Sequence, residues 1–229
     1  RARRLGRKSS FEDTVVDMRV CLASTSPARL MLLRQAGIEP LTVSPDVDED
    51  AIAAAAEAER GAPLPPAELV LLLARAKAAA VAHGLADEGT FDGLVIGGDS
   101  MFALGGRVYG KPYTPEEATR RWQEMRGATG ILHSGHSVFR VAPGSEPTEA
   151  TAVAEAAVTF AHDVSDAEIA AYVASEEPLH VAGAFTVDSL GGAFITRVDG
   201  DPSTVVGMSL STVRRLAAEL GVRWTDLWS

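Results

Sequence analysis

Stretches with a strand pattern and stretches with a helix pattern alternate along this chain from residue 19 onward, as they do in α/β proteins. The apolar run 19–23 (RVCLA) predicts a short buried strand, and a helix is then predicted from Pro27, with Ser26 as its N-cap, to Gly37. Further strands are predicted at 41–44, 93–97, 130–142, 150–162 and 192–198, with a hairpin at 101–109. Further helices are predicted at about 67–83, 114–126, 165–174 and 209–220. We therefore expect an α/β fold.

Two of the predicted helices begin with a capping box, in which a hydroxyl residue and a Glu three positions later satisfy free backbone N–H groups. The boxes are Thr114-Pro115-Glu116-Glu117 and Ser165-Asp166-Ala167-Glu168. A loop is predicted between the last strand and the last helix. No internal repeat or low-complexity linker interrupts this order, so we expect a single domain over 18–229.

The first 17 residues differ from the rest of the chain in charge. They carry five basic residues against three acids, a net charge of +2, whereas the whole chain of 229 residues carries −10. They contain no apolar stretch of the kind found in a secretory signal. We expect residues 1–17 to be a flexible basic leader without a chemical role; an arm that touches an acidic partner is the alternative.

The net charge and the single cysteine argue against several classes of protein. A chain at −10 would on average repel the phosphates of a nucleic-acid duplex, whereas a small phosphorylated ligand needs only a few local cations. Cys21 alone cannot form an internal disulfide. The Ala/Leu stretch 67–82 is interrupted by Glu68, Arg75 and Lys77, so no membrane span is expected. A reducing cytoplasm fits best.

The segment 24–29 (STSPAR) is the first candidate for chemistry. Backbone N–H groups at a helix start, together with the hydroxyls of Ser24 and Ser26 and the guanidinium of Arg29, make a natural phosphate cradle. An ordinary N-capped helix is the alternative.

The acidic run 45–50 (PDVDED), which contains Glu49, is the second candidate. Carboxylates in such a run bind Mg²⁺ or activate water when they face a phosphate. Most acidic runs are simply solvated loops, and that alternative stays open from the residues alone.

Asp99 is the third candidate, because it directly follows a buried apolar strand and two glycines in 96–100 (IGGDS). This is where α/β proteins position working residues, and the glycines would let a ligand approach the backbone. The alternative is a turn Asp that satisfies its own backbone.

Two lysines complete the candidates. The segment 105–112 (GGRVYGKP) imitates the spacing of a P-loop, but Pro112 replaces the hydroxyl residue and disfavours a helical Lys111. The P-loop interpretation is therefore rejected, and Lys111 is expected to lie in an extended turn from which it can reach a phosphate. Lys77 lies two residues from Arg75 in a predicted helix, so at most one of the two faces a shared site. His133 and His136 fall on opposite faces of a strand and are set aside as metal ligands.

Taken in order, these segments resemble the Maf family of nucleotide pyrophosphatases. The matching stretches are LASTSPAR (22–29), PDVDED (45–50), LARAKA (73–78), IGGDS (96–100), GKP (110–112), TGILH (129–133), YVASEEPL (172–179), AGAF (182–185), LGGAFI (190–195) and VVGMSL (205–210). Each motif is weak alone, but ten in the right order make a specific signal.

The resemblance implies an activity and a site. The implied activity is metal-dependent hydrolysis of nucleoside triphosphates, non-standard ones included, to a monophosphate and pyrophosphate. Glu49 and Asp99 would be the catalytic acids and the ligands of Mg²⁺ or Mn²⁺. The residues that would contact the phosphates are Ser24, Ser26, Arg29, Lys77 and Lys111. A nucleotide-binding regulator of septum formation with weak catalysis is the alternative function.

The resemblance also implies a fold and an assembly: a mixed sheet flanked by helices, with two lobes around a deep cleft as in inosine triphosphate pyrophosphatases, and a homodimer. Three positions depart from the family pattern. Ala28 replaces an Arg that would contact phosphate, and Val181 replaces a Lys. Asp188 replaces a Gln of the thymidine/uridine-type members, which makes Asp188 a candidate for base specificity, although a carboxylate cannot donate a hydrogen bond as an amide does.

Overall fold

A computed structural model describes residues 18–229, and the predicted basic leader lies outside the described residues. Within them, seven strands form one sheet: β1 Arg19–Ala23, β2 Leu41–Val43, β3 Gly93–Leu104, β4 Arg107–Tyr109, β5 Thr129–Val141, β6 Thr148–Phe160 and β7 Ile195–Asp199. Their order is β2-β1-β3-β5-β6-β7, and β4 pairs with β3. β1 runs parallel to β2 and β3, whereas the other pairs are antiparallel, so the sheet is mixed as expected.

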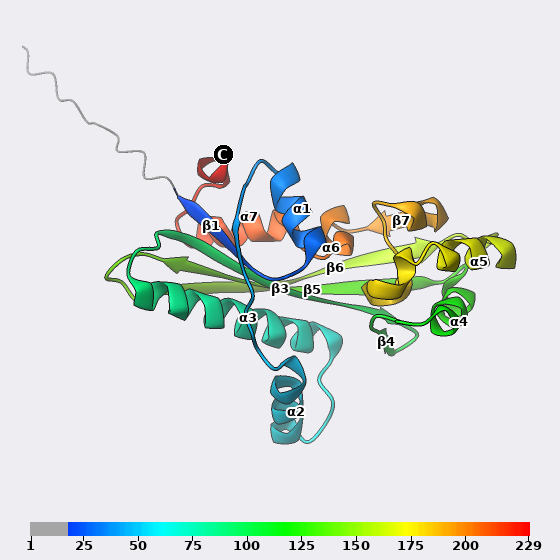
Figure 1. Ribbon diagram of the computed structural model, residues 1–229. Helices are drawn as coiled ribbons and strands as arrows, with labels where there is room; N and C mark the ends of the chain where they lie inside the picture. The colour runs from blue at the N-terminus through cyan, green and yellow to red at the C-terminus, as the bar shows by residue number, and fades with distance from the viewer. Residues whose placement is uncertain (1–17) are drawn as a thin grey trace, which may run out of the picture.

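Helices cover both faces of the sheet (Figure 1). The α-helices are α1 Pro27–Gln35, α2 Glu49–Arg60, α3 Pro66–Glu88, α4 Pro115–Met125, α5 Asp166–Ala174, α6 Pro202–Val206 and α7 Leu210–Glu219. Short 3₁₀ helices are η1 Glu177–His180, η2 Ala182–Ala184, η3 Leu190–Phe194 and η4 Trp224–Leu227. α3 lies along one face, and α1, α6 and α7 lie on the other. The predicted α/β class, with a mixed sheet flanked by helices, is confirmed.

The apolar interior forms three separate clusters, of which one lies between α3 and the sheet and two lie toward opposite ends of the sheet. At one end, Trp122 of α4 packs among aromatic rings, including Phe160 of β6 and Phe185. Toward the other end, Leu22 of β1 and Leu216 of α7 belong to a second, mainly aliphatic cluster. Polar side chains are therefore free to gather between two independently packed ends of one sheet.

By length and composition, α3 is the one helix of the described residues that could cross a membrane. It instead packs lengthwise on β3 and β5 and buries a face that includes Val70, Ala74, Ala78 and Val81. This contact is that of a core helix covering a sheet.

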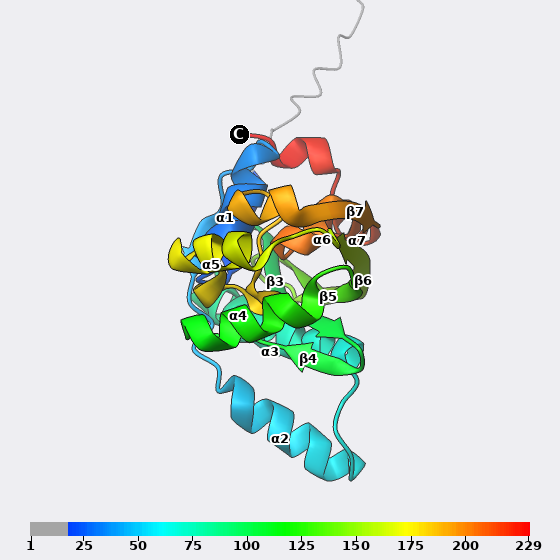
Figure 2. The ribbon, with the colours of Figure 1, turned by 90° about the vertical axis from the view of Figure 1, so that its right-hand side faces the viewer.

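α2 differs from the other helices because none of its residues is buried. It extends away from the sheet beyond α3, as Figure 2 shows, with Asp48 as its N-cap and Gly61 as its left-handed C-cap. The acidic run 45–50, for which a solvated loop was the alternative, becomes helical at Glu49, the first residue of α2.

The predicted end of a strand at 97 is wrong. β3 continues through Asp99 to Leu104, because residues 93–103 pair with β5, where Asp99 lies opposite Gly135, and Leu104 pairs with β4. The predicted hairpin at 101–109 is formed by the last residues of β3 and by β4. The polar residues in this strand interrupt the apolar pattern by which a strand is predicted. What extends the strand is its pairing with β5, a long-range contact that the local sequence does not indicate.

Other boundaries also differ from the predictions. The strand expected at 192–198 begins only at Ile195, because 190–194 forms η3, and part of the expected loop at 199–208 forms α6. α3 runs to Glu88 rather than to 83. The capping box at Ser165 is complete, whereas at Thr114 only the hydroxyl half forms, since Glu117 pairs with Arg residues of its own helix.

Candidate active site

A cavity of about 640 Å³ lies between the two ends of the sheet. All eight residues singled out from the sequence line it: Ser24, Ser26, Arg29, Glu49, Lys77, Asp99, Lys111 and Asp188. The three departures from the family pattern fall in the same cavity, since Ala28 and Val181 also line it. Segments far apart in the chain therefore meet at one site, and the roles of their residues remain predictions.

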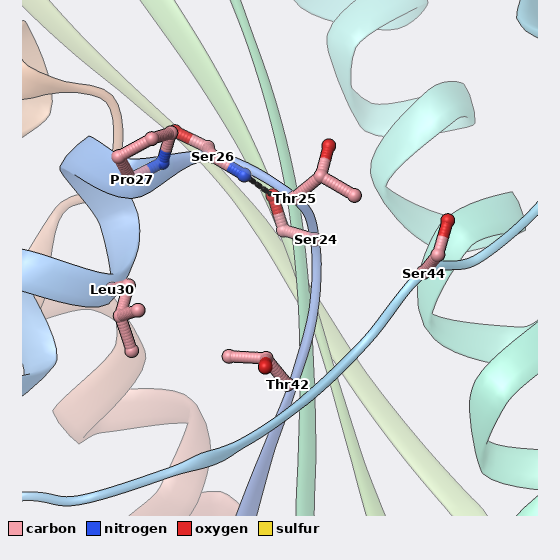
Figure 3. Close-up of a pocket in the computed structure, with 7 residues that line it drawn as sticks. All are labelled: Ser24, Thr25, Ser26, Pro27, Leu30, Thr42 and Ser44. Atoms are coloured by element: carbon pink, nitrogen blue, oxygen red, sulfur yellow. Dashed lines mark hydrogen bonds between the residues drawn. The ribbon is translucent and has the colours of Figure 1, made fainter.

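The turn between β1 and α1 forms one wall. Ser26 caps α1 by accepting a hydrogen bond from the backbone N–H of Arg29 at 3.4 Å, and Ser24 Oγ accepts one from Ser26 N at 3.1 Å. Figure 3 shows this turn from the side of an adjoining cavity of about 220 Å³, where Thr42 and Ser44 lie on the neighbouring segment. Hydroxyls and the free N–H groups of a helix start are thus held together at the cavity.

Arg29 is fixed by neutral groups. Its Nε donates to the carbonyl oxygen of Gly207 at 2.8 Å, and its two terminal nitrogens donate to Ser100 Oγ at 3.2 Å and Ser24 Oγ at 3.4 Å. Within the described part of the chain, no carboxylate lies at ion-pair distance from this guanidinium. Burial lowers the pKa of Arg29, whereas the charges of Asp99 and Glu49 act in the opposite direction. A half-buried cation without a paired anion favours an anionic ligand.

Lys77 lies between two carboxylates. Its Nζ is 2.9 Å from Glu49 Oε1 and 2.8 Å from Asp99 Oδ1. Lys77 and Asp99 are only 7% and 9% exposed. Burial raises the pKa of Asp99, and the nearby Lys77 opposes that rise. The ammonium group of Lys77 in α3 therefore bridges the carboxylates of Glu49 in α2 and Asp99 in β3.

The close approach of α3 to β3 depends on Gly97. A Cβ atom at this position would lie 2.6 Å from the carbonyl oxygen of Ala74 and 2.7 Å from Cβ of Ala78. Because Gly97 has no side chain, the helix reaches the strand closely enough for Lys77 to contact Asp99. Arg75 does not line the cavity and pairs instead with Glu149. Only one of the two cations therefore faces the site, as their two-residue spacing predicted.

Lys111 and Asp188 line the cavity from loops. Lys111 is exposed and follows β4 without a helix start, which agrees with the rejection of a P-loop. Asp188 is exposed and lies in the segment between η2 and η3. Neither side chain has an ion-pair partner among the described residues, so both remain available to a ligand.

Sequence reasoning gave no role to Ser100 and Gly207, which hold Arg29. Ser100 Oγ donates to Gly207 O at 3.1 Å and lies 2.6 Å from Ser134 Oγ. Gly207 lies in the turn between α6 and α7. The Asp201 carboxylate links the two helices across this turn, since it accepts hydrogen bonds from Ser203 in α6 and from Ser209 and Ser211 at the start of α7. Ser100 is next to Asp99 in the segment IGGDS, so its hydroxyl could have been predicted to lie in the site. The carbonyl of Gly207 lies 178 residues from Arg29, and no feature of the sequence indicates that the two meet.

No group of three or more His, Cys, Asp or Glu side chains suited to a metal ion occurs in residues 18–229. Glu49 and Asp99 nevertheless fit a hard divalent cation, since Mg²⁺ is commonly bound by one or two carboxylates together with substrate phosphates. His133 pairs with Glu155, and buried His136 accepts a hydrogen bond from Ser209 N at 2.8 Å, so the two histidines do not share a site.

Comparison with known proteins gives the family. The sequence model of the family described as Maf-like protein matches residues 19–220. The chain belongs to the Maf family. A relative from Leifsonia xyli subsp. xyli is 61% identical over 93% of this chain and 97% of its own length, and one from Rhodococcus jostii is 49% identical over 91% and 95%. Both are named nucleoside triphosphate pyrophosphatase.

Among solved structures, the Ham1 protein of Staphylococcus aureus is similar over 63% of this chain and 72% of its own, at 13% identity and a TM-score of 0.30. A likeness this distant supports no conclusion about activity. Family membership and the geometry of the cavity are the two observations on which a function can be built.

Proposed function

We propose that this Maf-family protein hydrolyses nucleoside triphosphates between the α and β phosphorus atoms, releasing a nucleoside monophosphate and pyrophosphate. The observation that carries the proposal is the convergence in one cavity of Arg29, Lys77 and Lys111 with Glu49 and Asp99. The names of the close relatives support it.

The phosphate chain would bind to a surface that we call the phosphate wall: Ser24, Ser26, Arg29, Lys77 and Lys111. Arg29 is held by neutral partners and has no carboxylate of its own at ion-pair distance in the described chain, so its charge is available to a phosphate. Ser24 and Ser26 add hydroxyl contacts at the start of α1. Fixed positive groups of this kind stabilise the charge that spreads over the phosphate oxygens in the transition state.

Charge in the cavity supports a divalent cation. Among the described lining residues, three cations stand against three carboxylates, so the side chains cannot by themselves offset the negative charges of a triphosphate. We propose that Glu49 and Asp99 hold Mg²⁺ or Mn²⁺. When bound, such an ion neutralises phosphate charge and polarises the bond that breaks.

The nucleophile would be water. Its oxygen forms a bond to one phosphorus of the α–β bridge, the bond from that phosphorus to the bridging oxygen breaks, and one carboxylate takes the proton. Asp99 suits this role because burial raises its pKa toward the range in which a general base works. Lys77 holds Asp99 and Glu49 in position through their ion pairs.

A nucleotide-binding regulator of septum formation is the second candidate, favoured by the loss of cationic side chains at Ala28 and Val181. The two candidates separate when the protein is incubated with a panel of nucleoside triphosphates and Mg²⁺ or Mn²⁺. Pyrophosphate release supports the enzyme. Tight binding without pyrophosphate supports the regulator, and release of orthophosphate contradicts the proposed bond.

We further propose that the protein works in the cytoplasm as a homodimer built from one domain over 18–229. Buried Cys21 fits a reducing compartment, and a cavity formed within one chain suits either oligomeric state. Light scattering coupled to size exclusion measures the oligomer directly, and a mass of about one chain, 24.0 kDa, would contradict the dimer.

A further inference from the structure

The guanidinium of Arg29 is oriented by three neutral acceptors. Its Nε donates to the carbonyl oxygen of Gly207 at 2.8 Å, whereas its terminal nitrogens donate to the hydroxyls of Ser24 and Ser100 at 3.4 and 3.2 Å. These bonds leave one N–H on each terminal nitrogen, and a pair of such groups can bind a phosphate in a bidentate manner. The direction in which Arg29 presents them depends most on the carbonyl of Gly207, since that contact is the shortest of the three.

Gly207 lies in a turn that has little local support of its own. Its φ angle is 127°, a conformation that glycine adopts more readily than other residues. Its N–H donates to the carbonyl oxygens of Ser203 and Thr204 at 3.2 and 3.1 Å and so ends α6, a helix of only five residues. A helix this short is not stable by itself, so the position of the turn depends on longer-range contacts.

The carboxylate of Asp201 holds the chain on both sides of this turn. Its Oδ1 accepts hydrogen bonds from Ser203 N at 2.9 Å and Ser203 Oγ at 2.7 Å. Its Oδ2 accepts from Ser209 Oγ and Ser211 Oγ, both at 2.7 Å, and from Ser211 N at 3.2 Å. Ser203 precedes Gly207 in the chain and the other two serines follow it. We call Asp201 and these three serines the turn clamp.

The charge of Asp201 is used within the turn clamp and not for a ligand. Burial would raise the pKa of Asp201, yet that pKa lies well below its ordinary value because the clamp hydroxyls donate to the carboxylate. Hydrogen bonds to a charged acceptor are stronger than neutral ones, so the clamp holds its serines firmly. Within residues 18–229 no cation lies at ion-pair distance from Asp201, and Asp201 does not line the cavity. Its effect on the site must therefore pass through the turn.

We propose that Asp201 is a positioning residue for the phosphate chain: through the turn clamp it fixes the carbonyl of Gly207, and so the direction of the Arg29 guanidinium. The inference rests on the proposed function for the role of Arg29. It adds to the site a residue outside the cavity, whose loss weakens the hold on phosphate although every group that touches the phosphate is still present.

The first test separates KM from kcat. Asp201→Asn keeps the size of the side chain but replaces one acceptor oxygen with a donor nitrogen, so one side of the turn clamp is lost. KM and kcat are measured by pyrophosphate release with GTP, ITP and UTP. KM is expected to rise about tenfold, by the same factor for each nucleotide, because a misdirected guanidinium binds phosphate less well. A purely structural role would lower the number of active molecules, and hence kcat, and would leave KM unchanged.

A milder variant covers the case in which Asp201→Asn fails to fold. Ser211→Ala removes a single hydroxyl from the exposed side of the turn clamp and leaves the other donors to Asp201 in place. KM is expected to rise about twofold, since one of several parallel hydrogen bonds is lost. The melting temperature of each variant, measured alongside, shows that the kinetics are those of folded protein.

The second test asks whether Asp201 acts through Arg29. Arg29→Lys keeps the positive charge but lacks the Nε–H that Gly207 accepts. In this background Asp201→Asn is expected to change KM by less than about twofold, because the contact that it disturbs is already gone. Glu168→Gln is the matched control. Glu168 is also a carboxylate that accepts N–H and O–H groups at a helix start, but it lines no part of the cavity, so KM should stay unchanged.

An unchanged KM in Asp201→Asn and Ser211→Ala would overturn the positioning role, and so would a loss in Asp201→Asn that multiplies with the loss in Arg29→Lys. Calorimetric titration with GTP in the absence of added metal separates this failure from that of the proposed function. Wild-type protein that binds GTP but releases no pyrophosphate contradicts the proposed reaction, and weaker binding by Asp201→Asn then still supports the positioning role. Pyrophosphate release together with equal GTP affinities contradicts the positioning role alone.

Discussion

The two walls of the cavity are built in different ways. On the phosphate wall, two of the three charged side chains come from regular elements, Arg29 from α1 and Lys77 from α3, and only Lys111 comes from a loop. Asp99 lies beside them in the middle of β3. The other side of the cavity is lined by the segment 180–188, which we call the base wall. It consists of 3₁₀ turns and a loop, fixed by Glu177 and Trp122. Rigid elements suit groups whose positions the chemistry fixes, whereas a loop tied at a few points can change its side chains without disturbing the sheet.

The two walls should therefore respond differently to substitution. A change on the phosphate wall, or in the acids beside it, should affect every nucleotide by the same factor. A change on the base wall should redistribute activity among nucleotides.

The largest effect is expected from Asp99→Asn. Removing this charge is expected to lower kcat by about 10²–10³, roughly 3–4 kcal/mol, because a preorganised charge acts mainly in the transition state. The factor should be the same for GTP, ITP and UTP. Turnover measured with each nucleotide, together with the melting temperature, tests both statements.

Asp199→Asn is the control for that substitution, because Asp199 pairs with Arg197 on the exposed strand β7. It should leave turnover unchanged. If Asp99→Asn keeps more than about a tenth of wild-type turnover, the assignment of Asp99 is wrong. A factor that differs strongly between bases would break the separation of the two walls.

The second prediction concerns the support of Arg29. Burial lowers the pKa of His136 from 6.5 to about 4, and His136 accepts the N–H of Ser209, two residues beyond the Gly207 that holds Arg29. Between these values the unfolded chain binds a proton that the folded chain does not. The contribution of His136 to the free energy of unfolding is therefore fully present above pH 6.5. It falls by about 3 kcal/mol as the pH drops toward 4.

His136→Asn should remove that part of the pH dependence. Denaturant unfolding at a series of pH values measures it, and comparing slopes rather than absolute stabilities removes the cost of lost packing. His133→Asn takes an imidazole from the other face of β5 and controls for the substitution itself. Identical slopes for wild type and His136→Asn would show that His136 does not govern the acid stability of this region.

The third prediction tests whether the contact of α3 with β3 builds the phosphate wall. Gly97→Ala inserts a methyl group 2.6 Å from Ala74 O, and overpacking of this kind costs about 1–3 kcal/mol. Activity should fall for all nucleotides alike, because Lys77 is moved away from Asp99. Gly84→Ala is the control, since Gly84 lies in α3, the helix that packs on Gly97, and its position faces open space. This change should raise the free energy of unfolding by about 0.5–1 kcal/mol. Unchanged melting temperature and turnover in Gly97→Ala would contradict this packing argument.

The sequence predicted the local parts of the phosphate wall well. The strand β1, the cap at Ser26 and the helix α1 follow from a short apolar run, a hydroxyl residue and a proline, which act over a few residues. The fold class follows from the interleaved order of elements. Local patterns supplied most of the candidate residues, but their union in one site came from the family resemblance, because no spacing rule indicates that Lys77 and Asp99 meet.

Long-range contacts explain what the sequence did not predict. β3 continues through Asp99 because of its pairing with β5, and Arg29 is fixed by a carbonyl oxygen 178 residues away. Glu177 lay inside a quoted motif, yet nothing local suggested that five donors from Tyr172 and residues 186–191 would converge on it. The base wall depends on such contacts more than the phosphate wall does, which is why it was the less predictable of the two.

The smallest effect is expected from Ala28→Arg, which restores a cation on the phosphate wall. Ala28 is half-buried and lines the cavity in the first turn of α1, where a positive charge opposes the helix dipole. Without a nucleotide the variant should lose a few tenths of a kcal/mol of stability, and with nucleotide it should gain affinity, lowering KM by about threefold for every base. The gain should shrink as salt is added, since an exposed charge is screened. Ala28→Gln, long but uncharged, controls for side-chain length. If Ala28→Arg leaves KM unchanged while altering the GTP-to-UTP ratio, position 28 belongs with the base wall and the division between the walls has to be redrawn.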